Sequence, residues 1–286
     1  MSSDQTPKQN DPHSENMVWT RIFYGREVME RIIETISRKE ALQQRYIMRY
    51  ILRAAMAGFI VMLMYVFTYQ VKADLGDTFN LGISKYITAL TFSVALVFIY
   101  FTNSELLTSN FMYFTVGVYY RKIKTSKALR VLTLCLLGNM LGIVFIAALV
   151  ASCEIVSPEM SQHLLHTVEA KTVGSDAWTI FVKGIFANFF INIAIIIAMQ
   201  LGDDFIAKIF TLLAGVAVFA YMGFEHVVAN SALFVLALML EPESVDLLHT
   251  GKNFVFSLLG NYVGGGLIIG LFYAFLNGDR KFETES

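Results

Sequence analysis

The chain has 286 residues, of which 56% are hydrophobic and 16% charged, and its mean hydropathy is +0.56. This composition is typical of a membrane protein and excludes an ordinary soluble domain. The net charge of -1 argues against a nucleic-acid partner, which needs a concentrated basic surface, and the two cysteines, Cys135 and Cys153, are too few for a disulfide framework or a metal site.

The amino-terminal region predicts two segments ahead of the first span. Residues 1–16 are polar and predict a disordered tail. Residues 17–51 place apolar side chains among charges at roughly helical spacing, which predicts an amphipathic helix on the cytoplasmic surface. Its apolar face could instead pack against the protein's own spans. Nothing here resembles a cleavable signal, so we expect the first span to direct its own insertion.

Long uncharged stretches predict six membrane crossings. They fall at about 52–71, 86–120, 131–153, 178–201, 209–240 and 254–277. A straight helix over 86–120 would be roughly 50 Å long, which is too long for one crossing. The stretch is also too short for two, so we expect two half-helices around the polar segment 103–110, and likewise around 223–230 in the stretch 209–240.

Non-helical backbone at membrane depth must be buried in protein or line a cavity, because unpaired amide groups cannot face lipid. The two breaks therefore predict a pathway. The basic residues predict its orientation. Seventeen Lys and Arg lie on the side of both termini, and only Lys72, Lys85, Lys171 and Lys252 lie on the other. This bias places both termini in the cytoplasm.

The two halves of the chain carry matching motifs. Glu105 and Asn110 correspond to Glu225 and Asn230, an offset of 120 residues, and "LLGNMLG" at 136–142 corresponds to "LLGNYVG" at 258–264, an offset of 122. A duplicated unit of three spans is inverted in the membrane. We therefore predict an all-α membrane protein with inverted repeats at about 52–153 and 178–278, broken second and fifth helices, and a cytoplasmic tail at 279–286.

The repeated glutamates have two readings. Glu105 and Glu225 could carry protons or ions, as intramembrane carboxylates often do. Alternatively, each braces its broken helix by accepting hydrogen bonds from freed backbone amides or from Asn188 and Asn261 on neighbouring spans. Bracing is the favoured reading, because both repeats keep the carboxylate although a pathway would need only one charge.

His226 is the only histidine within a predicted span, and the matching position in the first repeat is the apolar Leu106. An imidazole at this depth can donate a hydrogen bond or a proton to a passing anion. The alternative is a core histidine whose hydrogen bonds are satisfied. Thr108 offers a hydroxyl that could coordinate a small oxyanion, or that caps the half-helix beginning there.

Apolar side chains near the breaks could exclude hydrated ions, although a single one is more often core or lipid-facing. The candidates are Phe92, Leu96, Leu106 and Phe219. Lys171, in the outward segment 154–177, could attract anions to the mouth; a solvated surface lysine is the plainer alternative.

These motifs resemble those of the formate/nitrite transporters, pentameric bacterial proteins with an aquaporin-like protomer of six spans. The resemblance rests on "SELLTSN" (104–110), "KGIFAN" (183–188), "GFEHVVAN" (223–230) and "GNYVGGG" (260–266), and covers residues 17–278. It implies a pore in each protomer, with Thr108 on the irregular loop of the first broken helix and His226 on the second. Phe92, Leu96 and Leu106 would form one constriction and Phe219 the other.

The resemblance implies a homopentamer in the bacterial cytoplasmic membrane. It implies proton-linked transport of small monocarboxylates, most directly formate and also lactate or acetate, with nitrite or hydrosulfide as the alternative. Lys171 would draw in the anion, and Glu105 with Asn188 and Glu225 with Asn261 would brace the breaks. We expect no cofactor and no enzymatic activity, since the spans offer no catalytic set. An aquaporin would carry Asn-Pro-Ala at both breaks, but all four prolines lie elsewhere.

Overall fold

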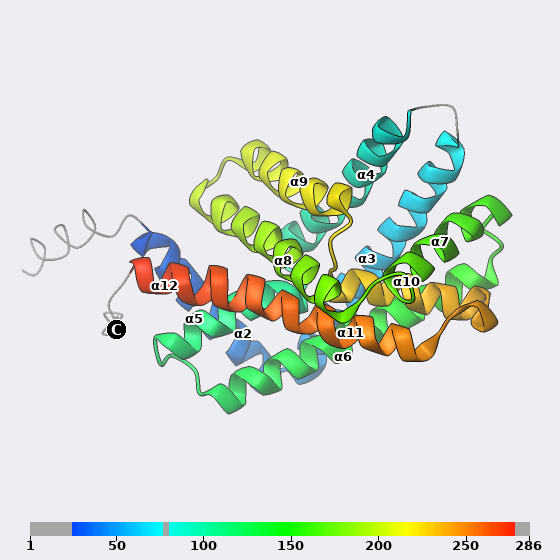
Figure 1. The fold of residues 1–286 in the computed structure, drawn as a ribbon. Helices are drawn as coiled ribbons and strands as arrows, with labels where there is room; N and C mark the ends of the chain where they lie inside the picture. The colour runs from blue at the N-terminus through cyan, green and yellow to red at the C-terminus, as the bar shows by residue number, and fades with distance from the viewer. Residues whose placement is uncertain (1–24, 77–79, 278–286) are drawn as a thin grey trace, which may run out of the picture.

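The computed structural model describes residues 25–76 and 80–277, and every regular element within these ranges is a helix (Figure 1). The predicted tails at 1–16 and 279–286 lie outside the described residues, as does the start of the predicted amphipathic helix. Six helices of the described part are long and apolar enough to cross a membrane. The all-α fold with six crossings is therefore confirmed.

The crossings follow one another in chain order. The first is α3 (Ile47–Leu75), and the second consists of α4 (Leu81–Phe101) and α5 (Leu107–Tyr119). The third is α6 (Thr125–Ser152) and the fourth α8 (Ala177–Gln200). The fifth consists of α9 (Phe205–Met222) and α10 (Val227–Leu240). The sixth runs from α11 (Leu247–Asn261) through the π-helical η2 (Tyr262–Leu271) into α12 (Phe272–Asn277), after the short turn η1 (Pro242–Ser244).

The amphipathic helix α2 (Arg26–Arg45) packs on the protein itself. Val28, Met29, Ile32, Ile33 and Ile36 are buried and share one face of the helix. This face lies against α3, α5 and α8. The alternative in which the helix covers the protein's own spans is therefore the correct one for residues 26–45.

A further helix, α7 (Pro158–Lys171), lies in the outward segment 154–177, for which the sequence analysis predicts no helix. Ser157 caps it, and Met160, Leu164 and Val168 recur at every fourth position and are buried against α3 and α10. The next crossing begins after Asp176, whose carboxylate accepts hydrogen bonds from the Thr179 hydroxyl (2.6 Å) and from the amides of Thr179 and Trp178. These bonds lower the pKa of the Asp176 carboxyl.

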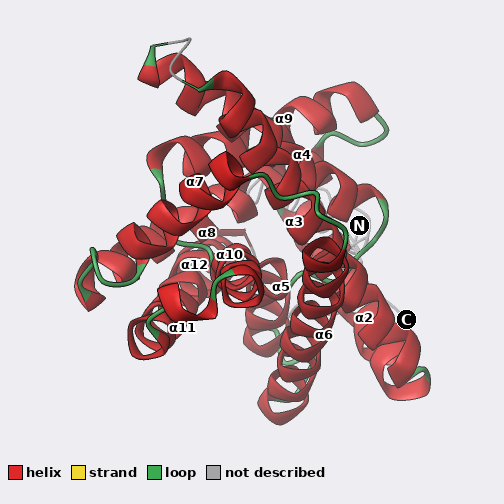
Figure 2. Ribbon diagram, turned by 90° about the vertical axis from the view of Figure 1, so that its right-hand side faces the viewer, coloured by secondary structure: helices red, strands yellow, loops and turns green. Residues whose placement is uncertain are grey.

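The two half-helices that follow the breaks lie at the centre of the molecule. Viewed from its end, α5 and α10 are surrounded by the other helices (Figure 2). Most residues of both are buried, although their sequences are as apolar as those of the outer helices. The first and last described residues meet, because the amide of Gly25 donates to Oδ1 of Asn277 (2.9 Å). Both ends of the described chain therefore lie on the same side of the membrane.

Glycines allow corresponding helix pairs of the two repeats to approach closely. A Cβ atom at Gly142 on α6 would lie 2.0 Å from the carbonyl oxygen of Ala55 on α3. At Gly264, in the sixth crossing, it would lie 2.1 Å from the carbonyl oxygen of Ile185 on α8. Small residues at such crossings let helix backbones touch in a membrane. These two contacts hold the first and third helix of each repeat together.

We expect Gly142→Ala and Gly264→Ala each to destabilise the protein by about 1–3 kcal/mol, because the new methyl group meets backbone rather than a movable side chain. Thermal unfolding of the purified protein in detergent measures the effect. Gly251→Ala is the matched control: it lies in α11 with open space around it, and should be neutral or slightly stabilising. Equal melting temperatures for all three variants would contradict the close-packing account.

Candidate functional site

The two breaks interrupt their helices with the same backbone geometry. The first break spans 102–106 and the second 223–226, between helices α4 and α5 and between α9 and α10. Each contains a residue in the left-handed region, Asn103 with φ +52° and Gly223 with φ +66°, which stops the preceding helix. The next amide then bonds back five residues, from Ser104 to Ile99 and from Phe224 to Phe219, both at 3.0 Å. The predicted inverted duplication thus extends to the backbone geometry.

An asparagine of the third helix in each repeat satisfies the backbone freed by the break. Asn139 Nδ2 donates to the carbonyl of Glu105 (2.8 Å), and its Oδ1 accepts from the amide of Leu107 (3.1 Å). Asn261 makes the equivalent bonds to the carbonyl of Glu225 (2.8 Å) and the amide of Val227 (2.8 Å). The sequence analysis named Asn261 as a partner of the Glu225 side chain and missed Asn139, although the repeated "LLGN" motif contains both.

Each glutamate side chain is buried in an ion pair. Glu105 Oε2 accepts from Lys39 Nζ (2.5 Å) and from Asn110 Nδ2 (3.0 Å). Glu225 Oε2 lies 2.9 Å from Lys171 Nζ and accepts from Asn230 Nδ2 (2.5 Å) and Asn253 Nδ2 (3.1 Å). Both carboxylates therefore have structural partners, but these are lysines and other asparagines, and not the backbone amides or the Asn188 and Asn261 side chains that the bracing interpretation named.

The expected pairing of Glu105 with Asn188 is wrong. Asn188 lies on α8 and donates instead to the carbonyl of Thr108 (3.0 Å) and to that of Asn261 (2.7 Å). Asn192, one turn further along, also donates to the carbonyl of Thr108 (3.3 Å). The side chain of Asn261 likewise bonds to the backbone of Glu225 and not to its carboxylate. Backbone groups freed by the breaks bond to the side-chain amides of asparagines, whereas the carboxylates pair with lysines.

Thr108 and His226 meet at the centre, one from each repeat. Thr108 lies in the first turn of α5, so its expected place on the irregular loop is wrong by two residues. Its Oγ1 lies 2.8 Å from Nε2 of His226, which caps α10. Nδ1 of His226 accepts from the amide of Ala229 (3.1 Å). A neutral imidazole with Nδ1 as acceptor carries its proton on Nε2, which then donates to Thr108 and leaves the threonine hydroxyl proton available.

The apolar candidates lie beside His226. A cavity of about 20 Å³ is lined by His226 and by Phe92, Leu96, Leu106 and Phe219, together with other apolar side chains. This volume holds about one water molecule. The rings of Phe92 and Phe219 meet edge to face at 6.2 Å, and Phe219 stacks on His226 at 5.8 Å. Phe92 thus contacts Phe219 and also lines the same cavity as Leu96 and Leu106, so its assignment to one constriction stays a prediction.

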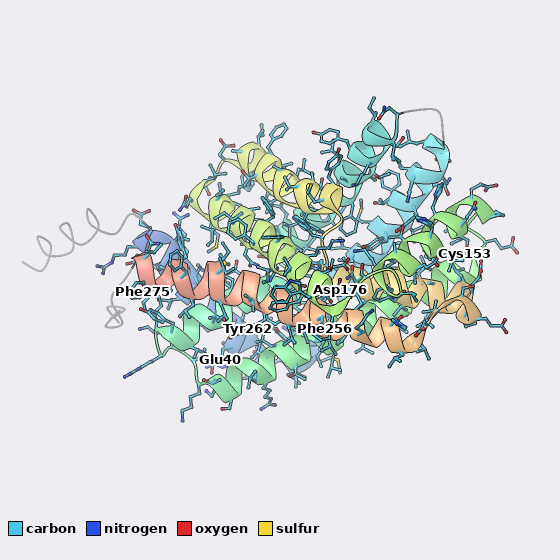
Figure 3. The ribbon with its side chains drawn as sticks, in the orientation of Figure 1. Glu40, Cys153, Asp176, Phe256, Tyr262 and Phe275 are labelled. Atoms are coloured by element: carbon cyan, nitrogen blue, oxygen red, sulfur yellow. The ribbon has the colours of Figure 1, made fainter. Side chains whose placement is uncertain are left out.

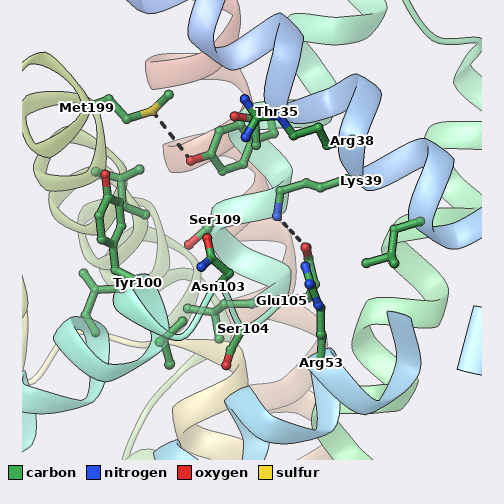
Figure 4. Close-up of a pocket in the computed structure, with 16 residues that line it drawn as sticks. Thr35, Arg38, Lys39, Arg53, Tyr100, Asn103, Ser104, Glu105, Ser109 and Met199 are labelled. Carbon is green, nitrogen blue, oxygen red and sulfur yellow. Dashed lines mark hydrogen bonds and ion pairs between the residues drawn. The ribbon is translucent and has the colours of Figure 1, made fainter. Parts of the chain in front are cut away.

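Leu96 and Leu106 separate this cavity from a larger one. The second cavity measures about 550 Å³ and opens beside α2 (Figure 4). Lys39, Arg38, Arg53 and Glu105 line it together with Ser109 and Tyr113, and the Lys39–Glu105 ion pair lies at its wall. The amino-terminal helix therefore contributes charged side chains to the site. Sequence reasoning missed Lys39, because it lies in a charge-rich segment where no lysine stands out.

Lys171 occupies the corresponding place on the opposite side. It is the last residue of α7, and its ammonium group pairs with Glu225 and lies 3.4 Å from the carbonyl oxygen of Phe224 in the second break. Its side chain is 14% exposed, as is that of Lys39. Lys171 is therefore not the freely solvated lysine of the plainer alternative. One lysine is held beside each break.

A double-mutant cycle tests whether the two ion pairs brace the breaks. We expect Lys39→Met and Lys171→Met each to cost about 3–5 kcal/mol, because each leaves a buried carboxylate without its counter-ion. Adding Glu105→Gln or Glu225→Gln in the same chain should recover part of the loss, with a coupling of about 1–3 kcal/mol. Unfolding in mixed detergent micelles gives these values.

The exposed pair Lys127–Glu40 is the control, since the lysine side chain is 51% exposed. Its cycle should give a coupling of about 0–1 kcal/mol. If the couplings at Glu105 and Glu225 are as small as that of the control, the ion pairs do not support the breaks.

Comparisons with known proteins agree with this geometry. Residues 26–275 match the sequence profile of the formate/nitrite transporter family. The nitrite transporter NirC of Escherichia coli (strain K12) is 30% identical over 77% of this chain and 80% of its own. The uncharacterized transporter YwcJ of Bacillus subtilis (strain 168) is 27% identical over 89% of this chain and 99% of its own.

Solved structures share the fold. A structure described as an FNT family ion channel superposes with a TM-score of 0.77 at 25% identity, and covers 87% of this chain and 98% of its own. A pentameric formate channel with formate bound has a TM-score of 0.70 at 23% identity, over 82% of this chain and 98% of its own. The chain belongs to the formate/nitrite transporter family, a family of membrane channels and transporters for small anions and not of enzymes.

Proposed function

We propose that this protein carries small monocarboxylates together with a proton through a pore in each protomer, and that formate is the principal substrate. The observation that supports this most directly is the neutral Thr108–His226 pair, whose imidazole lines a small cavity together with Phe92, Phe219, Leu96 and Leu106. Such a centre offers hydrogen bonds but no fixed positive charge. It suits a small acid that is uncharged when it passes.

Electrostatics explains why the proton is required. A bare carboxylate loses its hydration on entering an apolar constriction, whereas the neutral acid loses far less. Lys39 and Lys171 attract anions at the two mouths, although each already neutralises a glutamate. The anion takes up a proton either before it reaches the Thr108 hydroxyl or when it is bound there. It then crosses the apolar centre as the neutral acid. One negative and one positive charge then move together, so that transport is electrically neutral.

The narrow centre supports a small substrate. A cavity of about 20 Å³ lined by these apolar side chains favours formate over lactate or acetate, which carry additional carbon atoms. Nitrite is the second candidate, because a relative that is 30% identical is named a nitrite transporter. Nitrite is a planar triatomic anion of similar size, and its conjugate acid is also neutral, so the same route serves it. Hydrosulfide would use the same chemistry.

Uptake into proteoliposomes tests the function. We expect formate flux to rise about tenfold for each pH unit by which the outside is acidified, while the pH stays above the roughly 4 typical of a carboxylic acid, because the neutral fraction rises in that proportion. His226→Phe should reduce the flux strongly, since it removes both hydrogen bonds at the centre. Labelled formate, lactate and nitrite are compared in the same vesicles.

Two results would contradict the proposal. Flux of formate that is independent of pH and driven by membrane potential would indicate passage of the anion, without a proton. Passage of nitrite or hydrosulfide alone would leave the pore correct and the substrate wrong. His249→Phe serves as the control, because this histidine is partly exposed at the start of α11, pairs with Asp246 and lines neither cavity of the pathway, and should leave the flux unchanged.

We also propose that both termini are cytoplasmic, in a bacterial cytoplasmic membrane. The Gly25–Asn277 bond and the distribution of basic residues support this orientation. Figure 3 shows Cys153 and Phe275 at opposite ends of the molecule. Cys153 is exposed, whereas Cys135 is buried.

Cys153 gives a direct test of the orientation. A membrane-impermeant maleimide added to intact cells should label the wild-type protein, and Cys153→Ser should abolish labelling. Labelling that appears only after the cells are opened would reverse the orientation. For the oligomer, we propose a homopentamer, supported by the fold shared with a pentameric channel. The mass of the detergent-solubilised complex should be five times 32.2 kDa after subtraction of detergent.

A further inference from the structure

A further cavity, distinct from the two described above, lies on the flank of the helix assembly, away from the pathway. It measures about 390 Å³, within the roughly 300–1,000 Å³ range of small-molecule pockets. Its lining is almost wholly apolar and comes from α5, α6 and the sixth crossing. None of the residues proposed for the pathway lines it, although Leu107, the neighbour of Thr108 in the chain, does. We call this cavity the flank groove.

The flank groove has a buried floor and an open rim. Phe111 and Phe114 of α5 form the floor, and both are buried. Leu129 on α6 and Leu259 and Tyr262 of the sixth crossing form the rim, and are 59%, 48% and 38% exposed. The rings of Phe111 and Tyr262 meet edge to face at 5.6 Å and hold floor and rim together. The groove therefore opens sideways, where a membrane protein meets acyl chains.

The length of the groove matches one leaflet of a bilayer. Its α6 wall runs from Thr125, at the first turn of the helix, to Leu136, which is a rise of about 16 Å at roughly 1.5 Å per residue. The hydrocarbon core is roughly 30 Å thick, so this is about half of it. Figure 3 shows Tyr262, at the inner end, between Phe275 and Cys153 along the length of the molecule. The groove thus runs from one membrane surface to mid-depth.

Basic residues neighbour the groove lining in the sequence, towards its surface end. Arg121 follows the end of α5, Lys124 precedes Thr125, and Arg130 follows Leu129; all three are exposed. The salt bridges of the described residues leave these three cations without an acidic partner, whereas the nearby Lys127 is paired with Glu40. The groove therefore combines an apolar channel one leaflet long with positive charge at its mouth.

From this combination we infer that the flank groove binds an anionic phospholipid, with an acyl chain along Phe111, Phe114 and Tyr262 and the phosphate at Arg121, Lys124 and Arg130. Basic clusters at the surface end of a groove between spans attract anionic headgroups. A zwitterionic lipid has no net charge to be attracted. A second copy of this chain would have to bring an acidic segment to the mouth and an apolar one to the groove at once.

Fluorescence quenching by brominated lipids tests the site. The protein carries Trp19→Phe, Trp178→Phe and Leu259→Trp, which leaves one tryptophan on the groove rim. A second reporter replaces Leu63, which is 51% exposed near the middle of α3, in the same background. Each is reconstituted in phosphatidylcholine vesicles that contain a fixed small fraction of brominated phosphatidylglycerol, or of brominated phosphatidylcholine.

We expect the groove reporter to be quenched more by the brominated phosphatidylglycerol, and the Leu63→Trp reporter equally by both lipids. Arg121→Gln, Lys124→Gln and Arg130→Gln together should remove the preference, with a loss of roughly fivefold in relative binding per basic residue. Arg45→Gln, Arg49→Gln and Lys208→Gln together are the matched control. These three substitutions remove the same amount of positive charge on the same side of the membrane as the termini, but away from the groove. The groove reporter should then still be quenched more by the brominated phosphatidylglycerol.

Two outcomes would overturn the inference. Equal quenching by the two lipids at the groove, or a preference that survives loss of the three basic residues, would show an unspecific lipid-facing surface. Absence of quenching by either lipid at Leu259→Trp, with normal quenching at Leu63→Trp, would show that protein covers the groove, as in an interface between copies. The test uses no transport measurement, so it is independent of the substrate.

Discussion

Everything in this protein depends on how the backbone groups freed by a broken helix are satisfied inside a membrane. Water is absent at that depth, and each unpaired amide or carbonyl destabilises the fold by several kcal/mol. Asn139 and Asn261 solve the problem with one side chain for two backbone groups, and the neighbouring helix carbonyls of Arg53 and Lys183 accept from the amides of Glu105 and Glu225. Only because the breaks are stable can side chains of α5 and α10 point at each other.

The glutamates are a second layer of the same support. A buried carboxylate is unfavourable on its own, but it accepts several hydrogen bonds at once, and here it connects the break to an element outside the repeat core. For Glu105 that element is α2, and for Glu225 it is α7. These two helices lie before and between the repeats in the chain, yet they occupy corresponding positions, one at each mouth. The ends of the pathway are thus fixed by segments that the duplication did not supply.

Much of this could be predicted from the sequence, because the constraints were strong. Hydropathy gave six crossings, the excessive length of two stretches gave the breaks, and the paired motifs gave the inverted repeat. The partners of the asparagines were harder to predict. The sequence suggested that Asn188 pairs with Glu105, but which acceptor a side-chain amide reaches depends on how the helices pack. Lys39 and α7 carry no signal of their own, since a charged amphipathic segment reads alike whether it lies on the lipid or on the protein.

The central polar groups follow no two-fold symmetry. Matching the backbone bonds of Arg53 and Lys183 places Gly58 opposite Asn188 and Met62 opposite Asn192, and the motif offset places Val228 opposite Thr108 and Leu106 opposite His226. In a dimer of identical halves every contact appears twice, so a single hydroxyl–imidazole contact, without its symmetric copy, cannot arise. Fusion of the halves into one chain let each side of the passage evolve separately, and the clamp of Asn188 and Asn192 on Thr108 now makes the halves inseparable.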